Sequence, residues 1–455
     1  MKFHTLFVNG ELKTSNETLV SNLELSGNFS EVLNSIKQGQ QYLTSLEVED
    51  IILWLDAICA SWSDRQSDVQ QLYSNQGINF LIYWFRKKHL LEITDLALRG
   101  NRKFLDGFHT VNGSEVKLSA QPRGVVSHWI AGNVPMLGML SLIQGIITKN
   151  ANLVKVSKDN LYVVPTLLAS MAEIDICKSN GQLIEGKKIV NSIACIYYPS
   201  SDKSSLNEMS LNSQVRVAWG GMEAVENIIN LPRKFGCEDI VFGPKTSFMV
   251  IGSEKLSNLE DSKKIAKKAS IDASQFEQQG CNAPHTVFVE KGGVISPLEF
   301  AKLLSSEMEL ASNRIIRDPA VVPDVGKILT LRAKYEMMGE AFYSKGLEWS
   351  VLFSEDDIGL AEPCYFRTLF VRPIDDVMHI EKYCSHLTQT AGVALSDERK
   401  EQFALRVTAK GIDRVPDIGA MSAYEVPWDG IFMIDRLVRW CKICLLYTSP
   451  SPRDS

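Results

Sequence analysis

Residues 123–157 read RGVVSHWIAGNVPMLGMLSLIQGIITKNANLVKVS, and this stretch decides the fold. The segment Arg123–Ile130 is a short apolar run of the kind that forms a buried strand. It leads into a turn at residues 131–135, where proline at 135 suits the first position of a helix. The helix is expected to run to about Thr148, and ANLVKVS at 151–157 predicts the next strand. A strand, a helix and a second strand at this spacing predict a βαβ unit and therefore a parallel sheet.

The same alternation continues along the chain. Further strands are expected at Ile189–Tyr198, Val215–Gly221, Asp239–Pro244 and Thr246–Gly252, and an α/β pattern fills residues 285–430. Four lysines at positions 263, 264, 267 and 268 fall on an expected helix and are best explained as its solvated face. Residues 1–110 look helical instead. There Thr44-x-x-Glu47 has the form of a capping box, and apolar residues follow it at helical spacing.

The composition is that of a folded, mildly acidic protein. Of the 455 residues, 45% are hydrophobic and 22% charged, and 48 Lys and Arg against 54 Asp and Glu give a net charge of −6. A chain of this length is too long for one ordinary domain. It lacks the basic surface that attracts nucleic acid or anionic membranes, so neither is an expected partner.

The cysteines and the apolar runs indicate where the protein resides. The nine cysteines are scattered and odd in number, which favours free thiols in a reducing compartment. No N-terminal stretch resembles an export signal. The longest apolar run, residues 134–147, is about 14 residues and falls short of the ~20 that span a bilayer. We therefore expect a cytoplasmic protein with no membrane span.

The last residues, CLLYTSPSPRDS at 444–455, break the pattern. This Ser/Pro tract looks like the translation of a transposase sequencing adapter, so we expect a non-native tail that takes no part in the fold. Cys441 and Cys444 have CxxC spacing, which can indicate a redox or zinc site. One of the two belongs to the tail and no second Cys/His pair lies near them, so no metal site is expected.

One cluster, QQGCNAPH at 278–285, carries chemistry of its own. No GxGxxG, GxxxxGK[ST], HExxH or GxSxG motif occurs, so the commonest nucleotide, zinc-protease and hydrolase signals are absent. Cys281 follows a glycine just after an expected amphipathic helix, where backbone N–H groups could hold an accessible thiolate. A buried, inert cysteine is the alternative, since free cysteine is among the most buried residue types. His285 is either the base for this thiol or a simple turn histidine.

Residues 120–430 resemble the aldehyde dehydrogenase superfamily, and within it the LuxC-type fatty acyl-CoA reductases of bacterial bioluminescence. Four segments occur in the family's order. Gly132-Asn133-Val134-Pro135 resembles the superfamily's N-x-P turn, and residues 152–157 (NLVKVS) resemble its N-x-V-V-x-K-P-S strand. Residues 217–223 (VAWGGME) stand where its F-T-G-S-T-E turn belongs, and Gly280-Cys281 falls at its catalytic cysteine. Trp428-Asp429-Gly430 near the end adds to the likeness.

This resemblance implies an α/β, aldehyde dehydrogenase-like fold. It has a Rossmann-type cofactor domain, an α/β catalytic domain and a helical N-terminal part. The expected divisions are 1–110 for the mainly helical N-terminal part of the cofactor-binding domain, 111–245 for the dinucleotide-binding domain, 246–415 for the catalytic domain with Cys281, 416–443 for a C-terminal return segment and 444–455 for the tail.

By the same resemblance, Cys281 is the nucleophile, and the Asn133 side chain and the Cys281 backbone N–H hold the oxyanion. Hydrolytic members carry E-L-G-G-K, whose glutamate activates water, whereas the aligned residues here are VFGPK at 241–245. Val241 cannot deprotonate water, so an acyl-enzyme should resist hydrolysis and await hydride. This departure favours a thioester reductase over an aldehyde oxidiser, and it leaves the proton donor of the last step unassigned.

The resemblance also implies a dinucleotide site. Lys155 corresponds to the lysine that contacts the adenosine ribose, with Ser157 close behind it. Trp219, Gly220 and Gly221 correspond to the turn that covers the pyrophosphate. Glu362 is a loose match for the glutamate that binds the cofactor ribose, and a structural salt bridge explains it equally well. The family resemblance favours NADPH as the cofactor.

The function implied is NADPH-dependent reduction of long-chain fatty acyl-CoA to fatty aldehyde through an acyl-cysteine. An acyl-protein synthetase is a plausible partner, and a homo-oligomer is the superfamily habit. Two alternatives stay open. An acyl-phosphate reductase of the same fold should show a basic anion pocket near the cysteine, and no such cluster is seen. An acyl-binding or acyl-transfer subunit would be acylated at Cys281 but would bind no dinucleotide.

Overall fold

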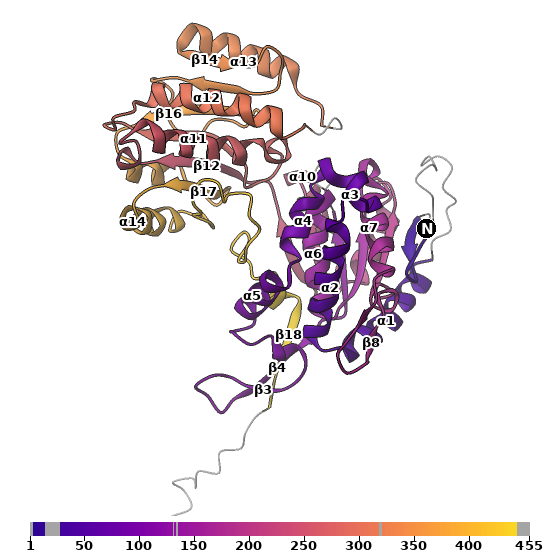
Figure 1. Ribbon diagram of the computed structural model, residues 1–455. Helices are drawn as coiled ribbons and strands as arrows, with labels where there is room; N and C mark the ends of the chain where they lie inside the picture. Colours follow the sequence, from indigo (N-terminus) through magenta and orange to yellow (C-terminus); the bar gives the residue numbers. More distant parts are fainter. Residues whose placement is uncertain (1–2, 14–27, 131, 133–134, 318–320, 444–455) are drawn as a thin grey trace, which may run out of the picture. The chain divides into compact units, whose positions relative to one another are not determined.

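The computed structural model describes residues 3–13, 28–130, 132, 135–317 and 321–443 (Figure 1). The chain divides into two compact units. The first comprises residues 1–74, 78–242 and 431–455, and the second comprises residues 75–77 and 243–430. Each unit is built on its own β-sheet.

The first unit contains a seven-stranded sheet in the order β11-β10-β5-β6-β9-β1-β2. Its strands are β1 (His4–Val8), β2 (Glu11–Leu12), β5 (Val125–Trp129), β6 (Ala151–Lys155), β9 (Ile193–Tyr197), β10 (Val215–Trp219) and β11 (Glu238–Phe242). Strands β5, β6, β9, β10 and β11 pair in parallel, as the repeated βαβ pattern predicts. Strands β1 and β2 differ from the helical expectation for residues 1–110. Antiparallel pairing with β9 buries Leu6 and Phe7 and places this short apolar run in the sheet.

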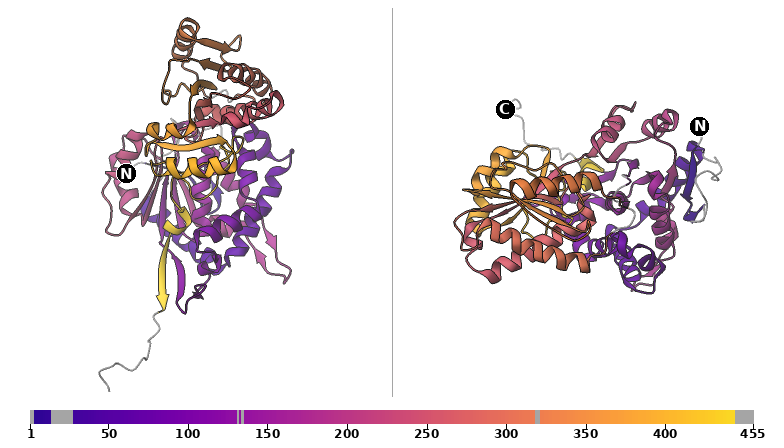
Figure 2. Two further views of the ribbon diagram at one scale, coloured as in Figure 1. Left: turned by 90° about the vertical axis from the view of Figure 1, so that its left-hand side faces the viewer. Right: turned by 90° about the horizontal axis from the view of Figure 1, so that it is seen from above.

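Helices cover both faces of this sheet (Figures 1 and 2). On one face, α1 (Phe29–Ser45), α9 (Lys203–Leu211) and α10 (Met222–Ile229) share an apolar core with β5, β6 and β9. On the other face, His128 of β5 bonds Ser141 Oγ of α6 (Pro135–Ile147) and Asn152 Oδ1 of β6, both at 3.1 Å. Helix α6 is therefore the connection between β5 and β6 that the quoted stretch predicts.

The remaining elements of the first unit surround this core. Its other helices are α2 (Val48–Ser63), α3 (Asp68–Tyr73), α4 (Ile78–Trp84), α5 (Lys87–Ala97), α7 (Val163–Ala172), α8 (Gly186–Val190) and α15 (Met433–Arg436). Two small sheets complete it, one of β3 (His109–Thr110), β4 (Lys117–Pro122) and β18 (Val438–Ile443), the other of β7 (Ile176–Cys177) and β8 (Leu183–Ile184). Strand β18 pairs antiparallel with β4, so the returning chain is tied to the first unit.

The capping box expected at Thr44-x-x-Glu47 is wrong. Thr44 lies inside α1 and donates to the carbonyl of Gln41 at 2.9 Å. Helix α2 does begin at Val48, but its first N–H donates to the carboxylate of Asp106 at 2.9 Å. A residue distant in sequence therefore supplies the cap that the local motif seemed to provide.

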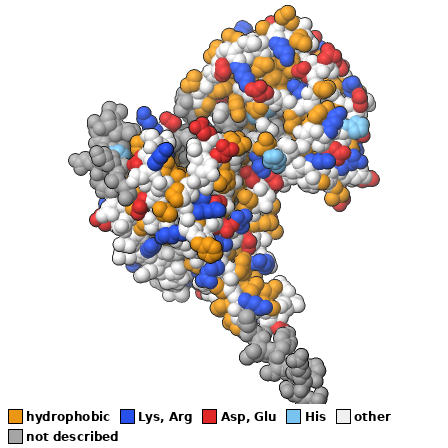
Figure 3. Space-filling view, turned by 180° about the vertical axis from the view of Figure 1, so that it is seen from behind, with side chains coloured by type: hydrophobic (Ala, Val, Ile, Leu, Met, Phe, Trp, Pro, Cys, Tyr) orange, Lys and Arg blue, Asp and Glu red, His pale blue; other side chains and the backbone are white. Residues whose placement is uncertain are grey.

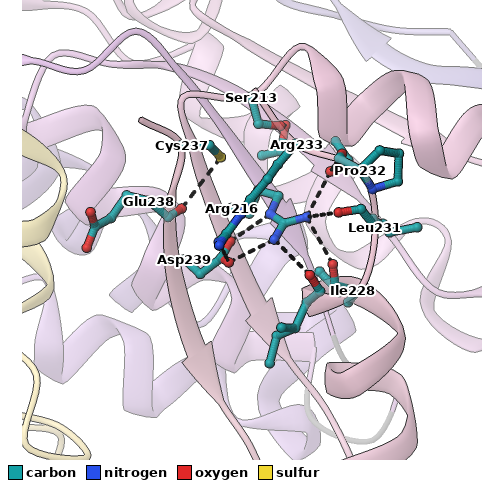
Figure 4. Close-up of polar contacts among 12 residues, drawn as sticks. Ser213, Arg216, Ile228, Leu231, Pro232, Arg233, Cys237, Glu238 and Asp239 are labelled. Atoms are coloured by element: carbon teal, nitrogen blue, oxygen red, sulfur yellow. Dashed lines mark hydrogen bonds and ion pairs between the residues drawn. The ribbon is translucent and has the colours of Figure 1, made fainter. Parts of the chain in front are cut away.

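Arg216 of β10 holds the end of α10 in place (Figure 4). Its side chain is 1% exposed and pairs with Asp239 of β11 at 2.6 Å. Its guanidinium also donates to the carbonyls of Ile228, Ile229 and Leu231. These are the carbonyls that a helix leaves without partners at its C-terminus. The contact fixes α10 to the sheet and so fixes the turn that precedes α10.

The second unit contains a six-stranded sheet in the order β14-β15-β16-β13-β12-β17. Its strands are β12 (Thr246–Ile251), β13 (Pro284–Glu290), β14 (Glu340–Tyr343), β15 (Ser350–Phe353), β16 (Thr368–Ile374) and β17 (Thr388–Ala394), and its helices are α11 (Leu259–Ser274), α12 (Pro297–Arg314), α13 (Val325–Met338) and α14 (Asp397–Thr408). One apolar core joins α11 and α12 to the sheet, and another joins α14 to it. Strand β14 alone runs antiparallel to its neighbour.

Short 3₁₀ segments connect several of these elements. They are η2 (Ser74–Gln76), η3 (Arg102–Leu105), η4 (Lys158–Asn160), η5 (Ser253–Lys255), η6 (Gln275–Gln278) and η7 (Val377–Tyr383). Acidic and basic side chains are interspersed over the face drawn in Figure 3, without a large field of one sign. Within the described ranges, no helix is both long and apolar enough to cross a membrane.

Candidate active site

Three neighbouring strands of the second unit begin at one edge of its sheet, and Cys281 lies there. Strands β17, β12 and β13 are parallel, so their first residues meet at the same edge. Cys281 comes just before β13, and its carbonyl accepts a hydrogen bond from Ser247 Oγ of β12 at 2.7 Å. The same hydroxyl accepts from the N–H of Thr390 in β17 at 3.1 Å. The cysteine is therefore tied to both adjoining strands through one serine.

The backbone that leads into Cys281 is strained. Residues 276–278 have φ of 48°, 52° and 61°, which is the left-handed region that non-glycine residues rarely adopt. A second left-handed run, residues 365–367, faces it, and the N–H of Phe366 donates to the carbonyl of Glu277 at 3.1 Å. The buried side chains of Glu277 and Arg367 pair at 2.6 Å. Such strain persists only where the surroundings hold it, and it gathers at functional sites.

Cys281 is half-buried and holds its proton tightly. Burial and the negative charge of Asp429 raise the pKa of the Cys281 thiol to about 12, although a hydrogen bond from Gln389 and the charge of Arg414 act in the opposite direction. A raised pKa favours the protonated thiol near pH 7. Cys281 is therefore not a preformed thiolate, and its reaction as a nucleophile needs a group that accepts its proton.

His285 is poorly placed to be that group. Its ring is buried and packs edge-on against Tyr365, with ring centroids 5.2 Å apart. Burial lowers the pKa of His285 to about 4, so the ring is neutral near pH 7. Among the contacts of the described residues, none joins it to Cys281. The packing favours the structural interpretation of this histidine.

Three polar side chains, Gln389, Arg414 and Asp429, affect the pKa of Cys281. Lys245 adjoins them through Asp429. Gln389 Nε2 donates to Asp429 Oδ1 at 2.5 Å, and Lys245 Nζ lies 3.8 Å from the same oxygen. Arg414 donates to the carbonyls of Met421 and Ala423, and its guanidinium carbon lies 4.7 Å from the ring centroid of Trp428. Lys245 and Asp429 lie in the segments VFGPK and Trp428-Asp429-Gly430, which carry part of the family likeness without a role for either residue, and Gln389 and Arg414 had no sequence signal.

The first unit has its own candidate site, where the strand order reverses. The chain passes from β5 to β6 and β9 on one side, and then to β10 and β11 on the other. Ligands of open α/β sheets bind at the carboxyl ends of the strands at such a reversal. Lys155 ends β6 and Trp219 ends β10, and both strands pair with β5 near Trp129. The topology therefore brings Lys155 and Trp219 to the edge where a nucleotide is expected.

The residues at this edge suit a dinucleotide. Burial lowers the pKa of Lys155, and its Nζ lies 5.7 Å from the ring centroid of Tyr198. Ser157 Oγ and Trp219 Nε1 are buried and have no hydrogen-bond partner among the described residues. Trp219 stacks on Phe242 with centroids 3.9 Å apart. These groups leave polar atoms available to a ligand with hydroxyl and phosphate groups.

The glycine turn that follows β10 is also open. The N–H of Gly220 donates to the carbonyl of Phe242 at 3.2 Å, which continues the pairing of β10 with β11. Gly221 precedes α10, and a Cβ added there would meet no atom within 4 Å. Backbone N–H groups at a helix N-terminus of this kind suit phosphate.

The structure does not place two other expected residues in the site. Asn133 lies outside the described residues. Glu362 is on the surface of the second unit, where its side chain is 85% exposed and pairs with Lys327 at 2.8 Å. That lysine lowers the pKa of Glu362. The pair corresponds to the structural salt bridge that was one of the two interpretations of this residue.

Metal ligands and disulfides do not appear in the part of the chain that the structure describes. No group of three or more His, Cys, Asp or Glu side chains there could hold a metal ion. The eight cysteines within the described ranges are free thiols.

Comparisons with known proteins show what the chain is similar to. The family model for acyl-CoA reductase (LuxC) matches residues 43–440. The long-chain acyl-protein thioester reductase of Vibrio harveyi is 24% identical over 422 residues, which cover 88% of this chain and 84% of that protein. The protein of the same name from Photorhabdus luminescens is 25% identical over 443 residues, with 91% and 85% covered.

Solved structures give the same fold. Aldehyde dehydrogenase 21 from Physcomitrella patens superposes with a TM-score of 0.66 at 11% identity, covering 98% of this chain and 99% of that one. An NAD-dependent benzaldehyde dehydrogenase from Corynebacterium glutamicum superposes with a TM-score of 0.62 at 14% identity, covering 97% and 98%. At these identities the likeness establishes the aldehyde dehydrogenase-like fold alone.

Proposed function

The chain belongs to the acyl-CoA reductase (LuxC) family, and from this we propose that it reduces long-chain fatty acyl thioesters to fatty aldehydes through an acyl-cysteine at Cys281, with NADPH as the reductant. The observation that carries the proposal is the family match over residues 43–440, which includes Cys281. Its curated relatives are named as thioester reductases, so reduction of a thioester is the reaction class.

In the proposed reaction, Cys281 Sγ attacks the acyl carbonyl and the thiol of CoA or of a carrier protein leaves. One thioester replaces another, so this exchange is nearly balanced in free energy. The Asn133 side chain and the backbone N–H of Cys281 stabilise the oxyanion, and each such donor contributes about 3–4 kcal/mol in other acyl-transfer sites. A bound nicotinamide dinucleotide supplies hydride to the thioester carbon. Collapse of the thiohemiacetal on Cys281 then releases the aldehyde and the thiol.

The proposal includes two groups of residues around this step. Val241 stands in the position of the glutamate that activates water in hydrolytic members. Because valine cannot activate water, the acyl-enzyme is protected from hydrolysis. Lys155, Ser157 and the 219–221 turn would hold the dinucleotide at the edge of the first sheet. Glu362 could contact the ribose of the dinucleotide only if its ion pair with Lys327 broke. The preference for NADPH follows from the family resemblance.

The acyl donor is proposed to be acyl-CoA or an acylated protein. The names of the curated relatives specify an acyl-protein thioester, which supports an acyl-protein synthetase as a partner. Competition between tetradecanoyl-CoA and an acylated carrier protein for one site on Cys281 would test this part. Acylation by tetradecanoyl phosphate instead of either thioester would favour the acyl-phosphate alternative.

The experiment that tests the proposal measures the intact mass of the protein after incubation with tetradecanoyl-CoA. We expect one tetradecanoyl adduct, mapped by peptide mass spectrometry to Cys281, that disappears when NADPH is added while tetradecanal forms. Cys281→Ser should form no adduct, and Cys177→Ser, at an exposed thiol, should behave as wild type. Aldehyde formation by Cys281→Ser would overturn the proposal. An adduct that survives NADPH would favour the acyl-transfer alternative.

A further inference from the structure

Asp429 is a buried carboxylate whose second oxygen lacks a partner. Its side chain is 4% exposed. Oδ1 accepts from Gln389 Nε2, whereas Oδ2 has no hydrogen-bond partner among the described residues. The nearest cation, Lys245 Nζ, is 3.8 Å from Oδ1 but only 2.6 Å from Asp413 Oδ2. A buried carboxylate that is only partly paired costs free energy, so its retention calls for an explanation.

Gln389 places this carboxylate beside the nucleophile. The Gln389 side chain donates to Asp429 Oδ1. The next residue, Thr390, donates its N–H to Ser247 Oγ, which in turn donates to the carbonyl of Cys281. Asp429 raises the pKa of the Cys281 thiol and Gln389 lowers it. A gap between the Cys281 thiol and the Asp429 carboxylate can be bridged by one water molecule or closed by a side-chain rotation, because catalytic hydrogen bonds often tighten only when substrate binds.

The backbone holds the carboxylate in place. Asp429 has φ of 49°, in the left-handed region, and is followed by Gly430 with φ of 72°. The preceding Trp428 ring stacks on Tyr424, with centroids 4.7 Å apart, and lies against the Arg414 guanidinium. A strained residue fixed by packing at both sides is the kind of geometry found at functional sites.

Other nearby groups are less suited to take the proton of Cys281. His285 has an Nδ1 that is unpartnered among the described residues, but its ring packs against Tyr365 and it is not among the groups that affect the pKa of Cys281. Asp413 is paired directly with Lys245. Asp272 accepts the N–H of Gly419 at 2.6 Å.

We propose that Asp429 is the general base that accepts the proton of Cys281 during acylation and returns it to the departing thiol. This role rests on the proposed function. As the bond from Cys281 Sγ to the acyl carbon forms, the Sγ proton moves to an oxygen of Asp429. As the bond from the acyl carbon to the CoA sulfur breaks, that proton moves to the CoA thiolate. After hydride has been delivered and the thiohemiacetal collapses, the Cys281 thiolate recovers one proton from solvent through Asp429.

The charged groups around Asp429 set the pH range of this role. Burial raises the pKa of Asp429, and Lys245 and Arg414 oppose that rise while Asp413 adds to it. Below this pKa the carboxyl is protonated and accepts nothing, so acylation slows as the pH falls through it. Above it, a carboxylate beside a protonated thiol reacts at a rate independent of pH, up to the pKa of the thiol. A cysteine without a base reacts only as the thiolate, so its acylation rate rises tenfold for each unit of increasing pH.

The test is the single-turnover rate of acylation of Cys281 by tetradecanoyl-CoA between pH 6 and 9, without dinucleotide. We expect a nearly level profile for wild type. For Asp429→Asn we expect a rate at least about 100-fold lower at pH 7, which rises tenfold per pH unit. Asp429→Glu, which keeps the carboxylate, should restore a large part of the rate and the level profile. Asp417→Asn, at an exposed aspartate outside the site, should match wild type.

Alkylation of Cys281 by iodoacetamide separates a base from a simple charge. Loss of the Asp429 charge should lower the pKa of the Cys281 thiol, so the alkylation midpoint of Asp429→Asn should move to lower pH. If Asp429 acted only through its negative charge, that charge would slow acylation of Cys281. Asp429→Asn would then acylate faster than wild type. An unchanged or faster acylation rate in Asp429→Asn overturns the role of Asp429 as the base and leaves the proposed function in place. Absence of any adduct in the wild type overturns the proposed function and this role with it.

Discussion

The ion pair between Glu277 and Arg367 holds the two left-handed runs together, and breaking it should destabilise the second unit. The Arg367 side chain is 0% exposed and that of Glu277 is 3% exposed. Arg367→Met leaves a buried carboxylate without its direct partner, because the Nε of Arg317 stays 3.7 Å from the other carboxylate oxygen. Removing one partner of a buried pair costs about 3–5 kcal/mol. We expect that loss of unfolding free energy for Arg367→Met.

The double variant Glu277→Met/Arg367→Met should recover most of this loss. The pair is incompletely hydrogen-bonded, since Arg367 Nε and Nη1 have no partner among the described residues. The attraction between the two charges therefore offsets only part of the free energy that their desolvation costs. Replacing such a pair by apolar residues of similar size is often neutral or stabilising. The backbone bond from Phe366 N–H to the carbonyl of Glu277 is unaffected by either change. We expect the double variant within about 1 kcal/mol of wild type.

Scanning calorimetry measures these differences through the unfolding temperature of the second unit. In a domain of 150–250 residues, 3–5 kcal/mol corresponds to a lowering of roughly 6–20 °C. The control is Arg406→Met, which removes an exposed ion pair with Glu381. It should shift the unfolding temperature of the second unit by less than about 3 °C. The reasoning is refuted if Arg367→Met melts within about 3 °C of wild type, or if the double variant is less stable than either single variant.

Three further predictions concern the two units. Arg216→Met should cost the first unit about 1–3 kcal/mol of stability, because buried carbonyls at the end of α10 lose their donor while Asp239 keeps its ion pair with Arg233, and urea unfolding measures this. Asn133→Ala should slow acylation of Cys281 about 10²–10³-fold without changing the unfolding temperature, and equal rates would exclude an oxyanion role. Lys155→Met should weaken NADPH binding roughly 10–100-fold as measured by tryptophan quenching, whereas the exposed Lys158→Met should not.

The local pattern of the sequence predicted the strands well. The residues of β5, α6 and β6 follow one another in the quoted stretch with alternating apolar runs and a helix-starting proline, so short-range chemistry suffices there. The N-terminal strand β1 was missed because five residues carry too little periodicity, and only pairing with β9 makes them a strand. The capping box failed for the same kind of reason, since Asp106 supplies the cap from another part of the fold.

The candidate site was only partly predictable. Cys281 and the residues at the ends of β6 and β10 have motif neighbours that mark them in the sequence. The side chains of Gln389 and Arg414 have no such signal, and the Trp428-Asp429-Gly430 segment gave no role for Asp429, because strand pairing and a distant loop bring these residues together. The alternative interpretations of His285 and Glu362 likewise depended on burial and partners that only the fold provides.

The most direct test of the central claim is a single turnover of the preformed acyl-enzyme with NADPH that carries deuterium at the transferred C4 position. The account predicts that the tetradecanoyl adduct on Cys281 disappears and that an equal amount of tetradecanal appears with one deuterium on C1. Loss of the adduct as tetradecanoic acid, or tetradecanal without deuterium, would contradict reduction of a Cys281 thioester by hydride.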